Sequence, residues 1–315
     1  MVTTESLGPA MDDTEERRPR VSVLSAVWNE SAHVAEMISS VQSQDMPEWE
    51  LLCVDDGSSD GTAEIIRAYA LRDSRVRMAS EGAKIGKVSA FNRAFAASKG
   101  EVIVLLGGDD RIPPWSLRTR YEALASLNAK EPAVAYSKVR YFSEDRRFDG
   151  LVVPKGSAGS HSGGSLAMNR VLAEILFPID ESLMSEDIWL GYGSELLASS
   201  VAIRPEVVVE GRVHAGNSMQ RGAGFVDMSE SIHHRYRAWR SLAEAERLPL
   251  DVDVRRALAG MWLAEELRYE GRLVRLGMFR ALSLKERAAL LSRAHPVLYW
   301  LRMRFFRSLT GLRGR

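Results

Sequence analysis

Residues 51–62 read Leu-Leu-Cys-Val-Asp-Asp-Gly-Ser-Ser-Asp-Gly-Thr, and the fold depends on this stretch. Its apolar beginning, residues 51–54, predicts a strand buried on both faces, as in a parallel sheet. Asp55 and Asp56 stand at the carboxyl end of that strand, where α/β sheets bind their ligands. A plain turn and helix N-cap accounts for residues 57–62 but not for the doubled aspartate. We therefore predict a ligand site at this strand end.

A second pair of carboxylates follows another apolar strand. Residues 102–106 form the most apolar strand of the sequence, and Gly107-Gly108-Asp109-Asp110 comes directly after it. Adjacent carboxylates repel each other unless a cation or hydrogen-bond donors offset their charge, and Mg²⁺ and Mn²⁺ prefer oxygen ligands. The alternative is a helix cap before Pro113-Pro114. Two such strand ends facing one crevice predict a site for a nucleotide diphosphate and a divalent cation.

The pattern around these strands predicts an α/β fold. Strands are expected at 21–27, 51–54, 75–79 and 102–106, with helices at 31–44, 63–71 and 88–97, which is the order of βαβ units in a parallel sheet. Farther along, we expect strands at 134–142 and 201–209, a Gly/Ser-rich loop at 156–165 and a helix at 186–198. The predicted organisation is a disordered tail (1–19), an α/β domain (20–225) and a helical extension (226–315).

Composition narrows the class of protein. The 315 residues are 45% hydrophobic and 27% charged, as in soluble globular proteins. Lys and Arg balance Asp and Glu at 42 each, so no global basic field favours nucleic acid as a partner. Cys53 is the single cysteine, which excludes an intramolecular disulfide. No apolar run reaches the length of a membrane span and no signal-peptide core is present, so we expect a cytoplasmic protein.

Two common phosphate-binding motifs fail here. The first strand is followed by Trp28-Asn29-Glu30 instead of the glycines of a dinucleotide-binding loop. Residues 82–88 imitate a P-loop, but only three residues separate the glycines, and Val88 replaces the hydroxyl that would bind magnesium.

Taken together, these residues resemble family 2 glycosyltransferases of the GT-A fold, a Rossmann-like α/β fold for nucleotide-diphospho-sugars. The resemblance covers roughly residues 20–220. It is carried by the ordered set 21–30, 54–62, 86–92, Asp109-Asp110, 164–168 and 180–187.

The resemblance implies a sugar-nucleotide donor bound across the strand ends. Its donor-binding residues would be Val27, Trp28, Glu30, Asp56, Lys87, Asp109 and Arg212. Mn²⁺ or Mg²⁺ would be held by Asp109, Asp110 and His214, and a structural role is the alternative for His214. Gly107 departs from the family pattern, because it stands where many members carry the first aspartate of an Asp-x-Asp motif.

The resemblance also implies an inverting reaction with Asp187 as the general base. In that role it would remove the proton of an acceptor hydroxyl during direct displacement at the anomeric carbon. A capping acid at the start of the 186–198 helix is the alternative. The acceptor would belong to polysaccharide, cell-wall or glycolipid synthesis and could be lipid-linked. Because of Gly107, a catalytically silent sugar-nucleotide-binding or scaffold protein is the second hypothesis.

The C-terminal region carries a charge of its own. From Leu284 onward there are eight Lys and Arg residues against one Glu, a net charge of +7. Leu298, Leu301, Phe305 and Leu309 recur at helical spacing among arginines, which predicts an amphipathic helix for an anionic membrane surface. A helix packed on the catalytic domain is the alternative. We expect a peripheral location on the inner face of the plasma membrane. For the helix that contains His233 and Arg235, we expect a solvated face at these residues.

Overall fold

The structure is a computed structural model that describes residues 18–146, 148–214 and 224–310. The predicted tail falls almost entirely outside the described residues. In the first half, strands β1 (Val21–Val27), β2 (Trp49–Asp55), β3 (Val76–Ser80) and β4 (Val102–Leu105) lie parallel in the order β3-β2-β1-β4. Helices α1 (Val34–Gln42), α2 (Thr62–Ala70) and α3 (Lys87–Ala96) connect them. The predicted βαβ pattern is confirmed, and every residue of β2 is buried.

The second half extends the same sheet with mixed polarity. β7 (Leu166–Asn169) lies antiparallel between β4 and β5 (Ala133–Phe142), β6 (Val152–Val153) pairs with β5, and β8 (Ser200–Arg212) runs parallel to β5. Together the described strands form one eight-stranded sheet. The strands expected at 134–142 and 201–209 are present. β6, β7 and the helices α4 (Ser116–Ala125) and α5 (Arg170–Leu176) were not predicted. Helix α4 lacks an apolar stripe because it buries Ser116 and Arg120.

The two faces of the sheet carry separate cores, because side chains alternate along a strand. Val23, Leu51 and Val104 point to the face that α1, α2 and α4 cover. Leu24, Leu52 and Leu105 point to the other face, which packs against α3, α5 and α6 (Asp187–Leu197). Register pairs such as Val23 with Leu51 hold the strands level, so the carboxyl ends of β1, β2 and β4 meet at one edge.

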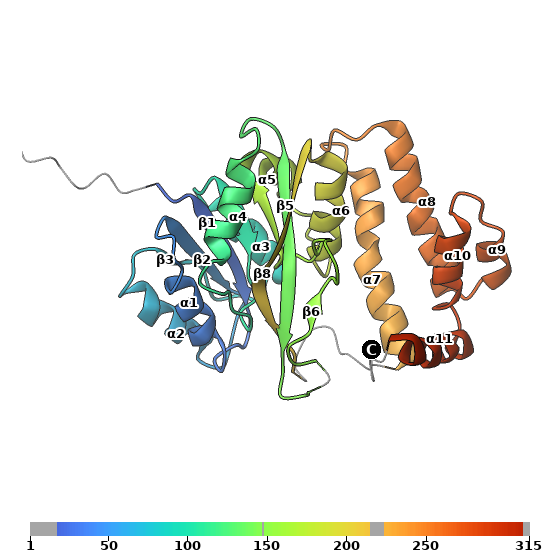
Figure 1. Cartoon of the computed structure of the whole chain (residues 1–315), viewed down its shortest axis with the longest axis horizontal. Helices are drawn as coiled ribbons and strands as arrows, with labels where there is room; N and C mark the ends of the chain where they lie inside the picture. The colour runs from blue at the N-terminus through green and yellow to red at the C-terminus, as the bar shows by residue number, and fades with distance from the viewer. Residues whose placement is uncertain (1–17, 147, 215–223, 311–315) are drawn as a thin grey trace, which may run out of the picture.

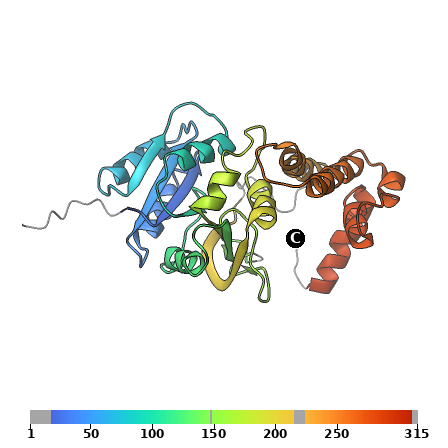
Figure 2. The same ribbon diagram turned by 90° about the horizontal axis from the view of Figure 1, so that it is seen from above.

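A helical region stands beside the sheet on the side of α6 (Figures 1 and 2). It consists of α7 (Phe225–Glu244), α8 (Val252–Tyr269), α9 (Leu273–Gly277), α10 (Leu284–Leu291) and α11 (Pro296–Thr310). α7 joins the core next to α6 through Trp239 and Leu242, and a third core lies among α8, α9 and α10. None of the helices in the described residues combines the length and the apolar character needed to cross a membrane.

The expected solvated face at His233 is wrong. The His233 side chain is 18% exposed, and its ring stacks 4.0 Å from the ring of Tyr269. Glu265 and Arg268 pair beside it, and both side chains are completely buried. The prediction failed because the partners of His233 belong to α8, the next helix in the chain. The local sequence of α7 does not show which of its faces packs against α8.

Candidate functional site

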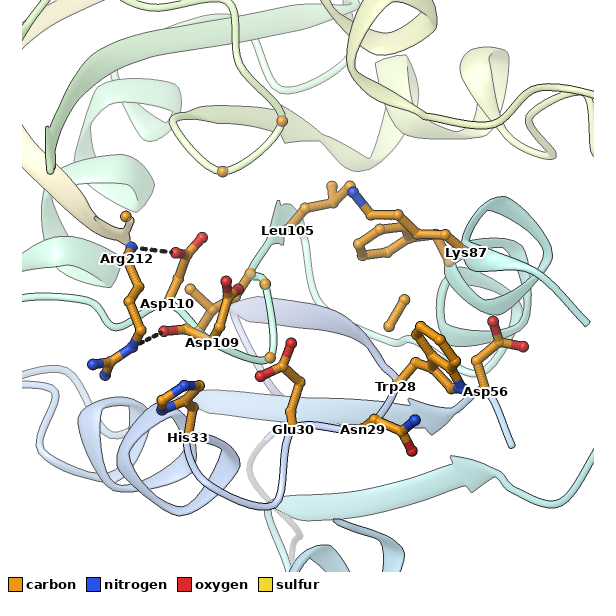
Figure 3. Close-up of a pocket in the computed structure, with 18 of the residues that line it drawn as sticks. Trp28, Asn29, Glu30, His33, Asp56, Lys87, Leu105, Asp109, Asp110 and Arg212 are labelled. Carbon is orange, nitrogen blue, oxygen red and sulfur yellow. Dashed lines mark hydrogen bonds between the residues drawn. The ribbon is translucent and has the colours of Figure 1, made fainter. Parts of the chain in front are cut away.

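A cavity of about 750 Å³ opens at the carboxyl ends of β1, β2, β4 and β8 (Figure 3). The structure brings most of the predicted site residues together in its wall. They are Trp28, Glu30, Asp56, Lys87, Asp109, Asp110, Asp187, Arg212 and His214. The cavity therefore lies where the two acidic strand ends predicted a crevice.

Val27 is the exception among the predicted donor-binding residues. Its side chain is 1% exposed in the core and does not line the cavity. A methyl group built on Gly108 would lie 2.9 Å from Val27 Cγ1, so the acidic loop packs directly on this valine. The Val27 carbonyl accepts a hydrogen bond from the backbone N–H of Asp56 over 2.8 Å. Val27 thus does not contact a ligand in the cavity but supports the loops that do. Its side chain, on the last residue of β1, points into the hydrophobic core on one face of the sheet.

Hydrogen bonds join the loop after β1 to the turn after β2. The backbone N–H of Asn29 donates to Ser58 Oγ over 2.8 Å, and that of Glu30 donates to Thr62 Oγ1 over 2.8 Å. Asp60 Oδ2 accepts from the backbone N–H of Ser31 over 3.0 Å. The Ser/Asp/Thr residues of the 51–62 stretch therefore do more than close a turn: they hold the loop that presents Trp28 and Glu30 to the cavity.

Asp56 fastens a third loop to the same wall. Its Oδ1 accepts from the backbone N–H groups of Ile85 and Gly86 over 2.5 and 2.9 Å. Lys84 from this loop places Nζ 2.9 Å from the ring centroid of Trp28, which is half exposed. Sequence reasoning missed Lys84. The signal was the glycine-and-lysine loop at 82–88, which resembles a phosphate loop without its spacing.

The acidic pair meets above Gly107. A methyl group built on this glycine would lie 2.9 Å from both Asp109 Oδ1 and Asp110 Oδ2, so the two carboxylates converge over the missing side chain. Burial and the neighbouring Asp109 raise the pKa of Asp110 to about 7. Burial and the same acidic pair raise the pKa of Glu30 to about 7 as well. The clustered carboxyl groups thus create a negative electrostatic potential at this end of the cavity, which favours binding of a cation.

Arg212, at the end of β8, and His214, two residues beyond it, flank the acidic pair, and Figure 3 shows Arg212 beside Asp109 and Asp110. The backbone N–H of Arg212 donates to Asp110 Oδ1 over 2.9 Å, and its Nε donates to the Asp109 carbonyl over 3.0 Å. Its guanidinium also pairs with Glu36 of α1. His214 Nε2 lies 3.2 Å from Asp109 Oδ2. These contacts fix the position of the acidic loop.

The predicted metal ligands do not form a complete cation site by themselves. Across the described ranges, no group of three or more His, Cys, Asp or Glu side chains is arranged to hold a metal ion. The contact between His214 and Asp109 occupies one edge of the acidic pair. The converging oxygens of Asp109 and Asp110 nevertheless suit a hard divalent cation that takes its other oxygen ligands from a bound molecule.

A second charged group stands elsewhere in the cavity wall. Lys87 Nζ pairs with Glu186 Oε1 over 2.9 Å, and Glu186 is 5% exposed, which raises its pKa. Burial alone would raise the pKa of Asp187, but Lys87, Arg235 and the Ser185 hydroxyl outweigh it and lower that pKa. Asp187 is therefore an ionised carboxylate in a half-enclosed site. Sequence reasoning missed the pairings of Glu186 and Arg235.

The arrangement suits an extended ligand that brings a cation with it. The exposed Trp28 and several acidic residues line the end near β1 and β2, and the ionised Asp187 lies on the α6 side. A general base must be ionised and within hydrogen-bond reach of the proton that it removes. The cavity can therefore hold an extended ligand while presenting a carboxylate to a second molecule.

The sequence model described as "Glycosyl transferase family 2" matches residues 22–172. That segment contains β1 to β4 with the Asp56 and Asp109–Asp110 strand ends. This part of the chain belongs to glycosyl transferase family 2. The predicted family is confirmed. Asp187, Arg212 and His214 lie beyond the matched residues, so their family roles stay predictions.

Curated relatives match part of the chain. The chain is 37% identical over 123 residues to the O-antigen biosynthesis protein RfbC of Myxococcus xanthus. This match covers 38% of this chain and 10% of RfbC. It is 28% identical over 120 residues to the putative teichuronic acid biosynthesis glycosyltransferase TuaG of Bacillus subtilis, covering 38% of this chain and 48% of TuaG. The chain thus matches less than half the length of these relatives.

Solved structures show the likeness in fold over most of the chain. TarS 1–349 of S. aureus, in complex with UDP-GlcNAc, superposes with a TM-score of 0.58 at 18% identity, covering 90% of this chain and 87% of that one. The mannosyltransferase PcManGT of Pyrobaculum calidifontis, in complex with GDP-Man and Mn²⁺, superposes with a TM-score of 0.58 at 19% identity. The match covers 94% of this chain and 85% of PcManGT. The predicted GT-A fold with a helical C-terminal region is confirmed.

Proposed function

We propose that the protein is an inverting glycosyltransferase that moves a sugar from a nucleotide-sugar donor to an acceptor hydroxyl in polysaccharide or cell-wall synthesis. The acceptor oxygen attacks the anomeric carbon and gives its proton to Asp187. The bond between that carbon and the diphosphate oxygen breaks, and the nucleoside diphosphate leaves. No covalent enzyme intermediate is required.

One observation carries the proposal: the acidic pair and the ionised Asp187 line the same cavity, and Lys87 stands in its wall with them. Lys87 pairs with Glu186 beside Asp187, and its charge also acts on Asp110. The donor complexes of the two superposed structures, with UDP-GlcNAc and with GDP-Man, support a sugar nucleotide as the ligand. The relatives' printed roles in O-antigen and teichuronic acid synthesis support the acceptor class.

A divalent cation, Mn²⁺ or Mg²⁺, is part of the proposal. Asp109 and Asp110 would hold it, with His214 beside Asp109. When bound, it would neutralise charge on the leaving diphosphate. The raised pKa of Asp110 supports this assignment, because two converging carboxylates are costly without a compensating charge.

The test is a donor screen with the purified protein and Mn²⁺ that follows release of nucleoside diphosphate from UDP-, GDP- and dTDP-sugars. Slow release from one donor, lost in Asp110→Ala, is the expected result. Asp187→Asn should keep donor binding, measured by thermal shift, and lose transfer to added acceptors. A thermal shift without turnover in any condition would favour a silent sugar-nucleotide-binding protein. No shift and no release with any donor would contradict the donor site itself.

We also propose that the acceptor side works at an anionic membrane surface, on the inner face of the plasma membrane. In α11, Leu298 and Tyr299 are partly buried, while Val297, Trp300 and Leu301 are exposed, the first two by 56% and Leu301 by 37%. The Tyr299 ring lies 6.0 Å from that of Phe225 at the start of α7. α11 thus packs against the protein with one face and exposes the other. Leu298, which was expected in the exposed apolar stripe, lies on the packed face. Phe305 and Leu309 lie outside the described side chains.

Charge favours this partner. The region from Leu284 carries +7, and each basic residue near an anionic surface contributes about 1 kcal/mol. Sedimentation with phosphatidylglycerol-rich vesicles, but not with phosphatidylcholine alone, is expected for the wild type. The paired substitution Trp300→Ser with Leu301→Ser should abolish it. Leu71→Ser is the matched control, since Leu71 is 89% exposed at the end of α2. Equal sedimentation of the paired variant and the wild type would contradict the proposal.

A further inference from the structure

Helix α7, the first of the helical region, reaches the candidate active site through the Arg235 side chain. Arg235 Nη2 donates a hydrogen bond to Asp187 Oδ2 over 2.7 Å, and the two side chains are 28% and 27% exposed. The two residues are 48 positions apart and belong to different helices. This contact joins the helical region to the proposed general base, and both side chains are too buried for an ordinary surface ion pair.

Helix geometry shows why Arg235 points at the sheet domain. Ala238, Trp239 and Leu242 follow it at three, four and seven positions, so all four share one face of α7. These three are buried in the main core that also contains Trp189 of α6, and the ring of Trp239 lies 5.7 Å from that of Tyr192 on α6. Because Asp187 is the first residue of α6, the packing of α7 on α6 brings the guanidinium beside this carboxylate.

Elsewhere around its circumference, α7 is held to α8 by hydrogen bonds from a buried arginine of α8. Arg268 donates to Ser229 Oγ over 2.8 Å and to the Ser229 carbonyl over 3.0 Å. It also pairs with Glu265 through two hydrogen bonds of 2.7 Å. The Arg268–Glu265 pair lies within α8, so a rotation of α7 would take the Ser229 acceptors away from a buried charge. Arg235 is therefore held in place from both neighbouring helices.

We propose that Arg235 is a positioning residue for Asp187, so that the C-terminal helical region is part of the transfer machinery. The proposal rests on the proposed function, since it concerns the base of that reaction. The Ser185 hydroxyl donates to Asp187 Oδ1, and Arg235 donates to Oδ2. Two donors on opposite oxygens fix the rotation of the carboxylate, while each oxygen keeps a further lone pair for the acceptor hydroxyl.

Charge from three elements surrounds Asp187. Lys87 comes from α3, Glu186 precedes it in the chain, and Arg235 comes from α7. Lys87 is already paired with Glu186, so within the part of the chain that the structure describes Arg235 is the cation in direct contact with Asp187. Its removal should leave Asp187 less firmly oriented and a weaker acid.

The experiment compares Arg235→Gln and Arg235→Lys with the wild type in the transfer assay across pH. For Arg235→Gln, the acidic limb of kcat should move up by about one pH unit, so that the rate below it falls about tenfold. The KM for the donor should stay within about twofold, because Arg235 is not among the described residues that line the cavity. Arg235→Lys should keep the limb near its wild-type position. Arg240→Gln is the matched control, since Arg240 is on the same helix and 58% exposed.

A double-substitution cycle supplies a readout that does not depend on activity. Arg235→Gln and Asp187→Asn should shift the denaturation midpoint non-additively, because each removes the partner of the other. Additive shifts together with an unmoved acidic limb would overturn the proposal. If the wild type transfers no sugar from any donor, the proposed function fails, and additivity in the cycle still decides whether Arg235 holds Asp187.

Discussion

Gly107→Ala should disable the acidic pair while leaving the fold intact. The new methyl group would lie 2.9 Å from one oxygen each of Asp109 and Asp110, whereas ordinary contact begins at 3.4 Å. Each carboxylate must therefore move away by about 0.5 Å. A displacement of about 0.5 Å is the largest that a preorganised binding site accepts without losing its geometry. Side-chain ends rotate easily, so the free energy of unfolding should change by less than about 1 kcal/mol.

The assay is Mn²⁺-dependent donor hydrolysis, with chemical denaturation alongside. We expect the Mn²⁺ concentration for half-maximal hydrolysis to rise about tenfold or more in Gly107→Ala, since a displaced carboxylate costs at least a factor of ten in affinity. Gly277→Ala is the control, because a methyl group there meets nothing within 4 Å. Gly107→Asp, which restores the first aspartate of the family motif, should not improve hydrolysis, since it brings the same Cβ. Wild-type Mn²⁺ dependence in Gly107→Ala would refute the reasoning.

Three further outcomes are expected. Without added cation, Asp110→Asn should be more stable than the wild type by up to about 4 kcal/mol at about pH 8. Because burial raises the pKa of Asp110 from 3.8 to about 7, this difference should shrink as pH falls through 7 and vanish below 3.8, which thermal melts at several pH values can follow. Asp60→Ala removes the acceptor that holds the loop after β1, so the donor-induced thermal shift should fall, with a stability loss of about 1 kcal/mol. Arg268→Met leaves the charge of Glu265 buried and unpaired, which should cost about 3 to 5 kcal/mol in urea denaturation, against less than about 1 for Arg240→Met at the surface.

Much of the candidate site could be predicted because its residues follow strands that the sequence marks clearly. A buried apolar run that ends in two aspartates is a local pattern, and it placed Asp56, Asp109 and Asp110 at the cavity without any knowledge of contacts. Asp187 was singled out through the family resemblance, because its local pattern fits a capping acid at the start of a helix equally well. The family and the GT-A fold rested on the order of these short motifs.

The errors lie where direction or partner is a tertiary property. Val27 ends a strand beside the site, but the twist and register of the sheet turn its side chain into the core. β7 and α4 were missed because a four-residue strand and a helix with a buried arginine carry no periodic signal. His233 lies inside a helix pair that only its packing partners define.

The sequence by itself determined the parallel strands, the acidic strand ends and the helical C-terminal region, because buried runs, doubled carboxylates and helical spacing are local. Only the tertiary structure decided what each charge faces. It converged Asp109 and Asp110 over Gly107, paired Lys87 with Glu186, and brought Arg235 of α7 to Asp187. These pairings join residues far apart in the chain, and their geometry follows from how helices pack on the sheet, which no local pattern contains.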